Sequence, residues 1–166
     1  MTHMKTNDIV IVGNGGLAKD VKFLLDRINE RDGNWNFLGF IDDKQEGENA
    51  PVIGNDSYIL QREEELYVAI AIGNSSIRKK LHSLYTKNPN IRFPNLIEPS
   101  VIMAAGSKLG EGNIICAGCI LAPDIVMGDC CYINLSCTIG HDAWLQSYVT
   151  VNPGTNISGN VIIGRE

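Results

Sequence analysis

The stretch LAPDIVMGDCCYINLSCTIGHDAWLQ, residues 121–146, has a large aliphatic residue at every sixth position. The series continues in both directions through ten consecutive hexads, and Ile97 and Met103 extend it backward. A period of six fits neither an α-helix nor an alternating strand. It predicts a parallel β-helix with three hexads in each triangular coil. The ten aliphatic positions are Leu109, Ile115, Leu121, Met127, Ile133, Ile139, Leu145, Val151, Ile157 and Ile163.

Small or β-branched side chains recur four residues after each aliphatic, where we expect them to point inward. Cys119, Cys131 and Cys137 occupy this slot and are interpreted as packing residues. Cys116 and Cys119 also form a C-x-x-C, for which zinc binding or a redox pair are alternatives to burial. The repeat does not explain Cys116 or Cys130.

The residues before the repeat have a different composition. They carry 12 Lys and Arg with 13 Asp and Glu, whereas the residues from Ile97 onward carry 2 and 6. The change falls in the proline-flanked stretch 94–99. It predicts two domains: an α/β domain over residues 1–96 and a β-helix domain over residues 97–166.

The first domain reads as alternating strands and helices. The stretch DIVIVGNGGLAKDVKFLLDRINE predicts a buried strand at 9–12, a glycine turn and an amphipathic helix. FLGFIDD predicts a second strand, and LYVAIAIGNSSIRKKL a third strand followed by a helix that Asn74, Ser75 or Ser76 can cap. This order is typical of a Rossmann-like unit. The expected apolar stripes are Leu17, Val21, Leu24, Leu25 and Ile28, and then Ile77, Leu81, Leu84 and Tyr85.

Polar residues follow all three predicted strands, and parallel strands end at the same edge of a sheet. A glycine turn before a helix can bind an anion, although it can equally be a tight turn with no ligand. Asp42 and Asp43 end the second strand, where dinucleotide folds bind a ribose. The sequence contains no G-K-[ST] motif, which argues against NTP hydrolysis. We expect a crevice that binds the nucleotide part of a substrate without hydrolysing it. The residues expected to form it are Gly13, Asn14, Gly15, Gly16, Asp42, Asp43, Gly73 and Asn74.

His141 lies within the repeat, two residues after an aliphatic position, where a side chain is expected to point outward near a corner. Such a histidine can be merely solvated. However, Asp142 could accept a hydrogen bond from one ring nitrogen and leave the other free as a base. The coils on either side would bring Pro123 and Gly159 next to the ring and leave space beside it. A metal site is not expected, because the repeat supplies a single histidine.

The overall composition narrows the class of protein. The net charge of −5 and the absence of a basic run argue against nucleic acid as the main partner. No apolar run is long enough to span a membrane, and no basic-then-apolar leader precedes the first strand. We therefore expect a cytoplasmic protein.

The motifs IVGNGGLAKD, FIDD, AIAIGNSSIRKKL, NLIEPSVIM and TIGHDAWLQSYVTVNPGTNISGNVIIG together resemble the sugar O- and N-acyltransferases of the sialic-acid and bacillosamine acetyltransferase type. The resemblance covers nearly the whole chain. It implies a left-handed β-helix, a homotrimer, acetyl-CoA as acyl donor and a nucleotide-linked sugar of surface glycan biosynthesis as acceptor. It also implies that His141 is the general base and that Asp142 orients it. We expect Asn152 and Gly159 to contact the donor.

The sequence departs from this family at two points. Some members carry a second histidine where Thr150 stands. Members also continue for several more hexads, whereas this chain stops at Glu166, three residues past its last aliphatic position. We therefore expect an incomplete donor groove and weak acetyl-CoA binding. The alternative function is a non-catalytic nucleotide-sugar-binding or scaffold protein that lacks the acyl-donor site.

Overall fold

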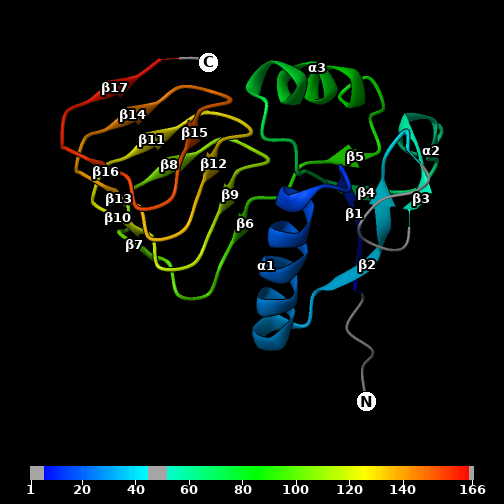
Figure 1. Cartoon of the computed structure of the whole chain (residues 1–166), viewed down its shortest axis with the longest axis horizontal. Coiled ribbons are helices and arrows are strands. Elements are labelled where there is room, and N and C mark those ends of the chain that lie inside the picture. The colour runs from blue at the N-terminus through cyan, green and yellow to red at the C-terminus, as the bar shows by residue number, and fades with distance from the viewer. Residues whose placement is uncertain (1–5, 45–51, 165–166) are drawn as a thin grey trace.

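The computed structural model describes residues 6–44 and 52–164. Its N-terminal half is a three-layer α/β unit, and its C-terminal half is a left-handed β-helix whose coils stack beside it (Figure 1). The expected fold class is therefore confirmed. The chain end at Glu166 lies outside the described residues.

The N-terminal half contains a five-stranded parallel sheet in the order β3-β2-β1-β4-β5. Because β1 lies between β2 and β4, the chain leaves β1 toward one edge and later returns to its other side. This reversal is the topological switch point at which open α/β sheets bind ligands. The strands are β1 (Asn7–Val12), β2 (Trp35–Ile41), β3 (Val52–Gly54), β4 (Leu66–Ile70) and β5 (Ile91–Arg92).

Helices cover both faces of this sheet: α1 (Gly16–Asp32) on one side, with α2 (Asp56–Leu60) and α3 (Ser75–Tyr85) on the other. Successive residues of β1 point to opposite faces, as in any strand. Ile9 and Ile11 pack with the buried stripe of α1, and Val10 and Val12 pack with the residues of α2 and α3.

The buried face of α3 differs from the expected stripe. Ile77 is 49% exposed, whereas Arg78 and His82 are buried. Leu81 and Leu84 are partly buried against the sheet cluster, as expected. Arg78 and His82 are buried because α3 packs against the β-helix as well as against its own sheet, and hydrophobic periodicity detects only the sheet side.

Strands in the β-helix pair with strands eighteen residues away, so each coil contains three hexads. For example, Ile133 pairs with Ile115 below it and Val151 above it. The sheet that packs against the N-terminal half is called the docking sheet. It consists of β6 (Leu96–Ile97), β9 (Ile114–Ile115), β12 (Tyr132–Ile133) and β15 (Thr150–Val151). The second sheet consists of β7 (Ile102–Met103), β10 (Ile120–Leu121), β13 (Thr138–Ile139) and β16 (Asn156–Ile157). The third sheet consists of β8 (Lys108–Leu109), β11 (Val126–Met127), β14 (Trp144–Leu145) and β17 (Ile162–Ile163).

The interior of the β-helix follows the predicted periodicity. The aliphatic ladder from Ile115 to Val151 is buried, and the three slot cysteines are at most 1% exposed. At each of the three corners the chain turns through a residue in the left-handed region, in columns spaced by eighteen. At the far corner, between the second and third sheets, these residues are Gly106, Asp124, Asp142 and Asn160.

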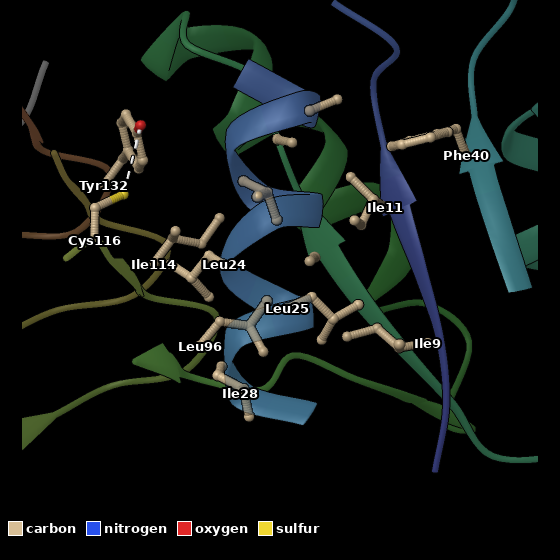
Figure 2. Close-up of a cluster of buried hydrophobic side chains, with 14 residues drawn as sticks. Ile9, Ile11, Leu24, Leu25, Ile28, Phe40, Leu96, Ile114, Cys116 and Tyr132 are labelled. Carbon is tan, nitrogen blue, oxygen red and sulfur yellow. Dashed lines mark hydrogen bonds between the residues drawn. The ribbon is translucent and has the colours of Figure 1, made fainter. Parts of the chain in front are cut away.

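The two halves share a hydrophobic core. Helix α1 lies between its own sheet and the docking sheet, so its buried stripe contacts both (Figure 2). The outward-facing residues Leu96, Ile114 and Tyr132 of the docking sheet are therefore at most 5% exposed. At the edge of this contact, Oε1 of the buried Glu98 accepts a hydrogen bond from Nε of Arg27 at 3.3 Å.

Candidate active site

His141 lies at the far corner, in the connection between β13 and β14. Its side chain is 61% exposed, and its Nδ1 is 2.7 Å from Oδ2 of Asp142. Since a carboxylate can only accept, Nδ1 carries the proton and a neutral ring keeps its lone pair on Nε2. The outward orientation and the contact with Asp142 agree with the sequence-based expectation.

The backbone of the corner brings this pair together. Asp142 has a φ of 56°, a left-handed conformation that aspartate adopts more readily than most residues. Asp142 N donates to Pro123 O of the coil below, and Asn160 N of the coil above donates to His141 O. The corner is therefore fixed from both sides by backbone hydrogen bonds.

Gly159 makes room for the imidazole. A Cβ atom at this position would lie 2.8 Å from Nε2 and 2.9 Å from Cε1 of His141. The ring thus leans over Gly159, and any side chain there would displace it. Among the described residues, no hydrogen bond occupies Nε2, so this atom is available to a substrate proton.

The strand-end residues of the N-terminal half lie at one edge of the sheet. A Cβ at Gly15, Gly16 or Gly73 would meet nothing within 4 Å, so these three glycines border open space. Gly13 differs: with a φ of +103°, its Cβ would lie 2.9 Å from Ala71 O, so glycine is required for the turn to pass β4. Among the described residues, no side-chain hydrogen bond caps the N-terminus of α1, and the end of a helix is a place where an anion can bind.

The other predicted crevice residues have mixed surroundings. The side chain of Asn14 is buried, and Asn74 caps α3 through a 3.0 Å bond from Ile77 N. Asp42 and Asp43 border a cavity of about 220 Å³ next to β2 and β3. The glycine turn does not line that cavity. The acids therefore lie at the end of β2 and the glycines at the end of β1, without sharing one cavity.

The strand-end residues predicted to form the crevice lie on the opposite side of the chain from His141. The N-terminal half contacts the docking sheet and the adjoining corner at Cys130 and Tyr148. The far corner is the one corner of the triangle that does not touch the docking sheet; it lies on the side of the β-helix facing away from the N-terminal half (Figure 1). One chain therefore does not bring its own strand-end residues to its own imidazole.

The two residues expected to contact the donor are also separated. Gly159 is beside His141, whereas Asn152 lies at another corner, between β15 and β16, where its carbonyl accepts from Thr155 Oγ1 at 2.7 Å. Thr150, where some family members have histidine, lies on the docking sheet and accepts a hydrogen bond from Arg78.

All five cysteines are free and buried, including the C-x-x-C pair. Burial raises the pKa of Cys116 and of Cys131 to about 11, so neither thiol is a ready nucleophile. Within the described ranges, no group of three or more potential ligands could hold a metal ion. Packing therefore accounts for these residues.

Sequence analysis did not single out Arg78, which is 2% exposed and makes five hydrogen bonds at the contact between the halves. It stands beside Lys79 and Lys80 in a charged helical run, and nothing in the residue pattern distinguishes it from them.

Comparisons with known proteins agree with this architecture. The PglD N-terminal domain family matches residues 8–84. Over the described part of the chain, no helix is long and apolar enough to cross a bilayer.

Solved structures match almost the full length. The acetyltransferase domain of PglB from Neisseria gonorrhoeae, in complex with acetyl coenzyme A, is 26% identical with a TM-score of 0.86, covering 96% of this chain and 77% of that one. PerB from Caulobacter crescentus, in complex with CoA and GDP-perosamine, is 28% identical with a TM-score of 0.86, covering 96% and 75%. WeeI from Acinetobacter baumannii is 27% identical with a TM-score of 0.81, covering 95% and 74%.

Proposed function

We propose that this chain, a hexapeptide-repeat acyltransferase whose residues 8–84 match the PglD N-terminal domain, transfers an acetyl group from acetyl-CoA to a nucleotide-linked sugar. The observation that carries the proposal is the 2.7 Å contact between His141 and Asp142, which leaves Nε2 open at the surface. Two similar proteins have been solved with acetyl-CoA or with CoA and a nucleotide sugar.

In this mechanism His141 is the general base. Nε2 accepts a proton from the amino or hydroxyl group of the sugar as that group attacks the acetyl carbon. Acetyl-CoA supplies the activated thioester, whose C–S bond breaks when the new bond to nitrogen or oxygen has formed. His141 then returns its proton to the departing sulfur. General-base assistance of this kind contributes roughly 10²–10⁴-fold.

Asp142 would hold the ring in the productive tautomer and stabilise the imidazolium that forms. Gly159 would keep the ring in this position, because any side chain there would collide with Nε2 and Cε1. Asn152 remains part of the proposed donor site, although it must act from a different corner of the coil.

The nucleotide would bind at the strand ends. The support is the open space around Gly15, Gly16 and Gly73, the uncapped N-terminus of α1 and the carboxylates of Asp42 and Asp43. Gly13, Asn14 and Asn74 would shape the turns from which these groups project. The division into a nucleotide-binding domain of residues 1–96 and an acyltransferase domain of residues 97–166 follows the same assignment.

A homotrimer would resolve the separation between crevice and imidazole, because the crevice of one chain could face the far corner of another. The second and third sheets expose an apolar surface suited to a second copy. Its exposed members are Ile102, Ile120, Val126, Trp144 and Ile162. A cytoplasmic enzyme of surface glycan synthesis is the setting that such substrates favour.

The alternative is a binding or scaffold protein that holds a nucleotide sugar without modifying it. The separation of the two sites within one chain is the observation that favours it, since an isolated chain could bind without reacting. Purified protein mixed with acetyl-CoA and a panel of amino-sugar nucleotides distinguishes the two. Release of free thiol with an acetylated product supports the enzyme. Saturable binding of a nucleotide sugar with no thiol release supports the alternative.

A further inference from the structure

Arg78 is a buried cation in an unfavourable place. It lies in the first turn of α3, where the helix dipole disfavours positive charge, and its side chain is 2% exposed. Burial lowers the pKa of its guanidinium. The hydrogen bonds that the guanidinium makes must therefore offset both penalties.

The guanidinium satisfies five uncharged acceptors. Nη1 donates to Ile72 O at 2.7 Å and to Gly73 O at 3.2 Å. Nε donates to Cys130 O at 2.8 Å. Nη2 donates to Tyr148 O at 2.7 Å and to Thr150 Oγ1 at 2.8 Å.

These acceptors belong to two parts of the molecule with different proposed roles. Ile72 and Gly73 form the strand-end turn after β4, on the edge proposed to bind the nucleotide. Cys130 and Tyr148 are corner residues with φ of 51° and 69°, and Tyr148 follows His141 by seven residues in the same run of hexads. The planar guanidinium of Arg78 thus bonds directly to the strand-end turn and to the corner of the β-helix.

We propose that Arg78 is a positioning residue that holds the nucleotide-binding edge at a fixed orientation to its own β-helix and so, in the proposed trimer, to the imidazole of a neighbouring chain. This inference rests on the proposed function. It explains why the position holds arginine: a lysine provides one flexible ammonium and cannot satisfy acceptors in three directions at fixed angles.

Other contacts should keep the two halves docked when Arg78 is replaced. His82 Nδ1 lies 3.0 Å from the Tyr148 hydroxyl, and His82 Nε2 lies 3.1 Å from Glu111 Oε1. The apolar contact between α1 and the docking sheet is separate from α3. Variants of Arg78 should therefore fold while losing precise orientation.

The test compares Arg78→Lys and Arg78→Met with the control Lys80→Met, which removes a charge from the exposed side of the same helix. We expect kcat/KM for the nucleotide sugar to fall about 10- to 100-fold in both Arg78 variants, because small misplacements of a substrate are costly. The KM for acetyl-CoA should stay within about twofold, because Arg78 does not touch the proposed donor site. Equal losses for both substrates, in step with a lower melting temperature, would overturn the proposal.

A second measurement does not depend on catalysis. Spin labels at Ser83→Cys in α3 and Lys108→Cys in β8 report the distance between the halves, and the native cysteines are buried and should not compete. We expect a shifted or broadened distance distribution in the Arg78 variants and none in Lys80→Met. If the wild-type chain acetylates no nucleotide sugar, the proposed function fails, yet these distances still decide whether Arg78 fixes the orientation. Unchanged distances in Arg78→Met would refute it.

Discussion

Oδ2 of Asp142 lies 2.7 Å from Nδ1 of His141, although the two residues are neighbours in sequence and most neighbours point apart. The left-handed conformation of Asp142, with a φ of 56°, turns its carboxylate back toward the ring. The same backbone geometry recurs at Asp124, one coil below, where no histidine precedes it. This repetition provides a matched control for the chemistry of the pair.

Replacing His141 by alanine should abolish acetyl transfer and leave the fold intact. The side chain is 61% exposed and contributes little to the core. We expect kcat to fall roughly 10²–10⁴-fold, measured as thiol release, with a melting temperature within about a degree of wild type. Normal kcat in the soluble variant would remove His141 from the mechanism.

Asp142→Asn tests the orienting carboxylate without straining the corner, since asparagine also tolerates the left-handed region. The amide can stabilise the wrong tautomer, and in an orienting carboxylate such a change lowers kcat by up to ~10⁴-fold. Asp124→Asn makes the same change at the same type of corner and should leave kcat unchanged. Similar losses in both variants would point to a general effect of charge.

Gly159→Ala should displace the imidazole. Its new Cβ would lie 2.8 Å from Nε2, a distance that forces the ring to move. We expect kcat/KM to fall about 10- to 100-fold, because the base would no longer meet the substrate proton. Gly164→Ala, which meets nothing within 4 Å, is the control. The two variants behaving alike would show that the room beside the ring is not used.

Asp42→Ala combined with Asp43→Ala should weaken binding of the nucleotide sugar and spare acetyl-CoA. Loss of hydrogen bonds to a charged group predicts an increase of about 10- to 100-fold in Kd, measured by calorimetry. Asp26→Ala removes an exposed carboxylate from α1 and should change neither affinity. Unaltered affinity for the nucleotide sugar in the double variant would exclude these acids from the site.

Glu98 should make the contact between the halves sensitive to acid. Burial raises the pKa of this carboxyl, but hydrogen bonds from Ser100 and Arg27 outweigh it and hold the pKa below its usual value. The folded state therefore binds its proton less readily than the unfolded state. Its stabilising contribution is present above the ordinary pKa of a glutamate and is lost as pH falls through the lower folded value.

The corresponding experiment is denaturant unfolding of wild type and Glu98→Gln between about pH 3 and 7. The difference in free energy of unfolding should be largest near neutral pH and should shrink in acid. A difference that does not change with pH would mean that the charge of Glu98 contributes nothing.

Periodicity predicted the β-helix and three of the five strands of the N-terminal sheet, but it did not predict the short elements β3, α2 and β5. Every sixth residue from Ile115 to Val151 is buried, and β1 and α1 form where the apolar pattern placed them. The sequence also predicted the outward imidazole with its neighbouring carboxylate. These features are local or strictly periodic, so the residue pattern alone indicates them.

Contacts between the halves were beyond sequence reasoning. Ile77 looked like a core residue and is exposed. Arg78 looked like a surface residue and is buried, because the β-helix covers a side of α3 that its own sheet does not. The sequence also did not predict that His141 lies on the side of the β-helix facing away from the N-terminal half. A period of six distinguishes inside from outside but not which of the three faces meets the N-terminal half.

The docking of a single face restricts how the gene for such a protein can change in length. Deleting six residues between β9 and β13 would preserve the buried ladder, yet every later strand would move to the adjacent sheet, and the imidazole would rotate by a third of a turn to a corner bordering the docking sheet. Only deletions or duplications of eighteen residues return it to the same side. We therefore expect the chain to gain or lose whole coils of eighteen residues upstream of His141, although a single hexad is enough to preserve the buried ladder.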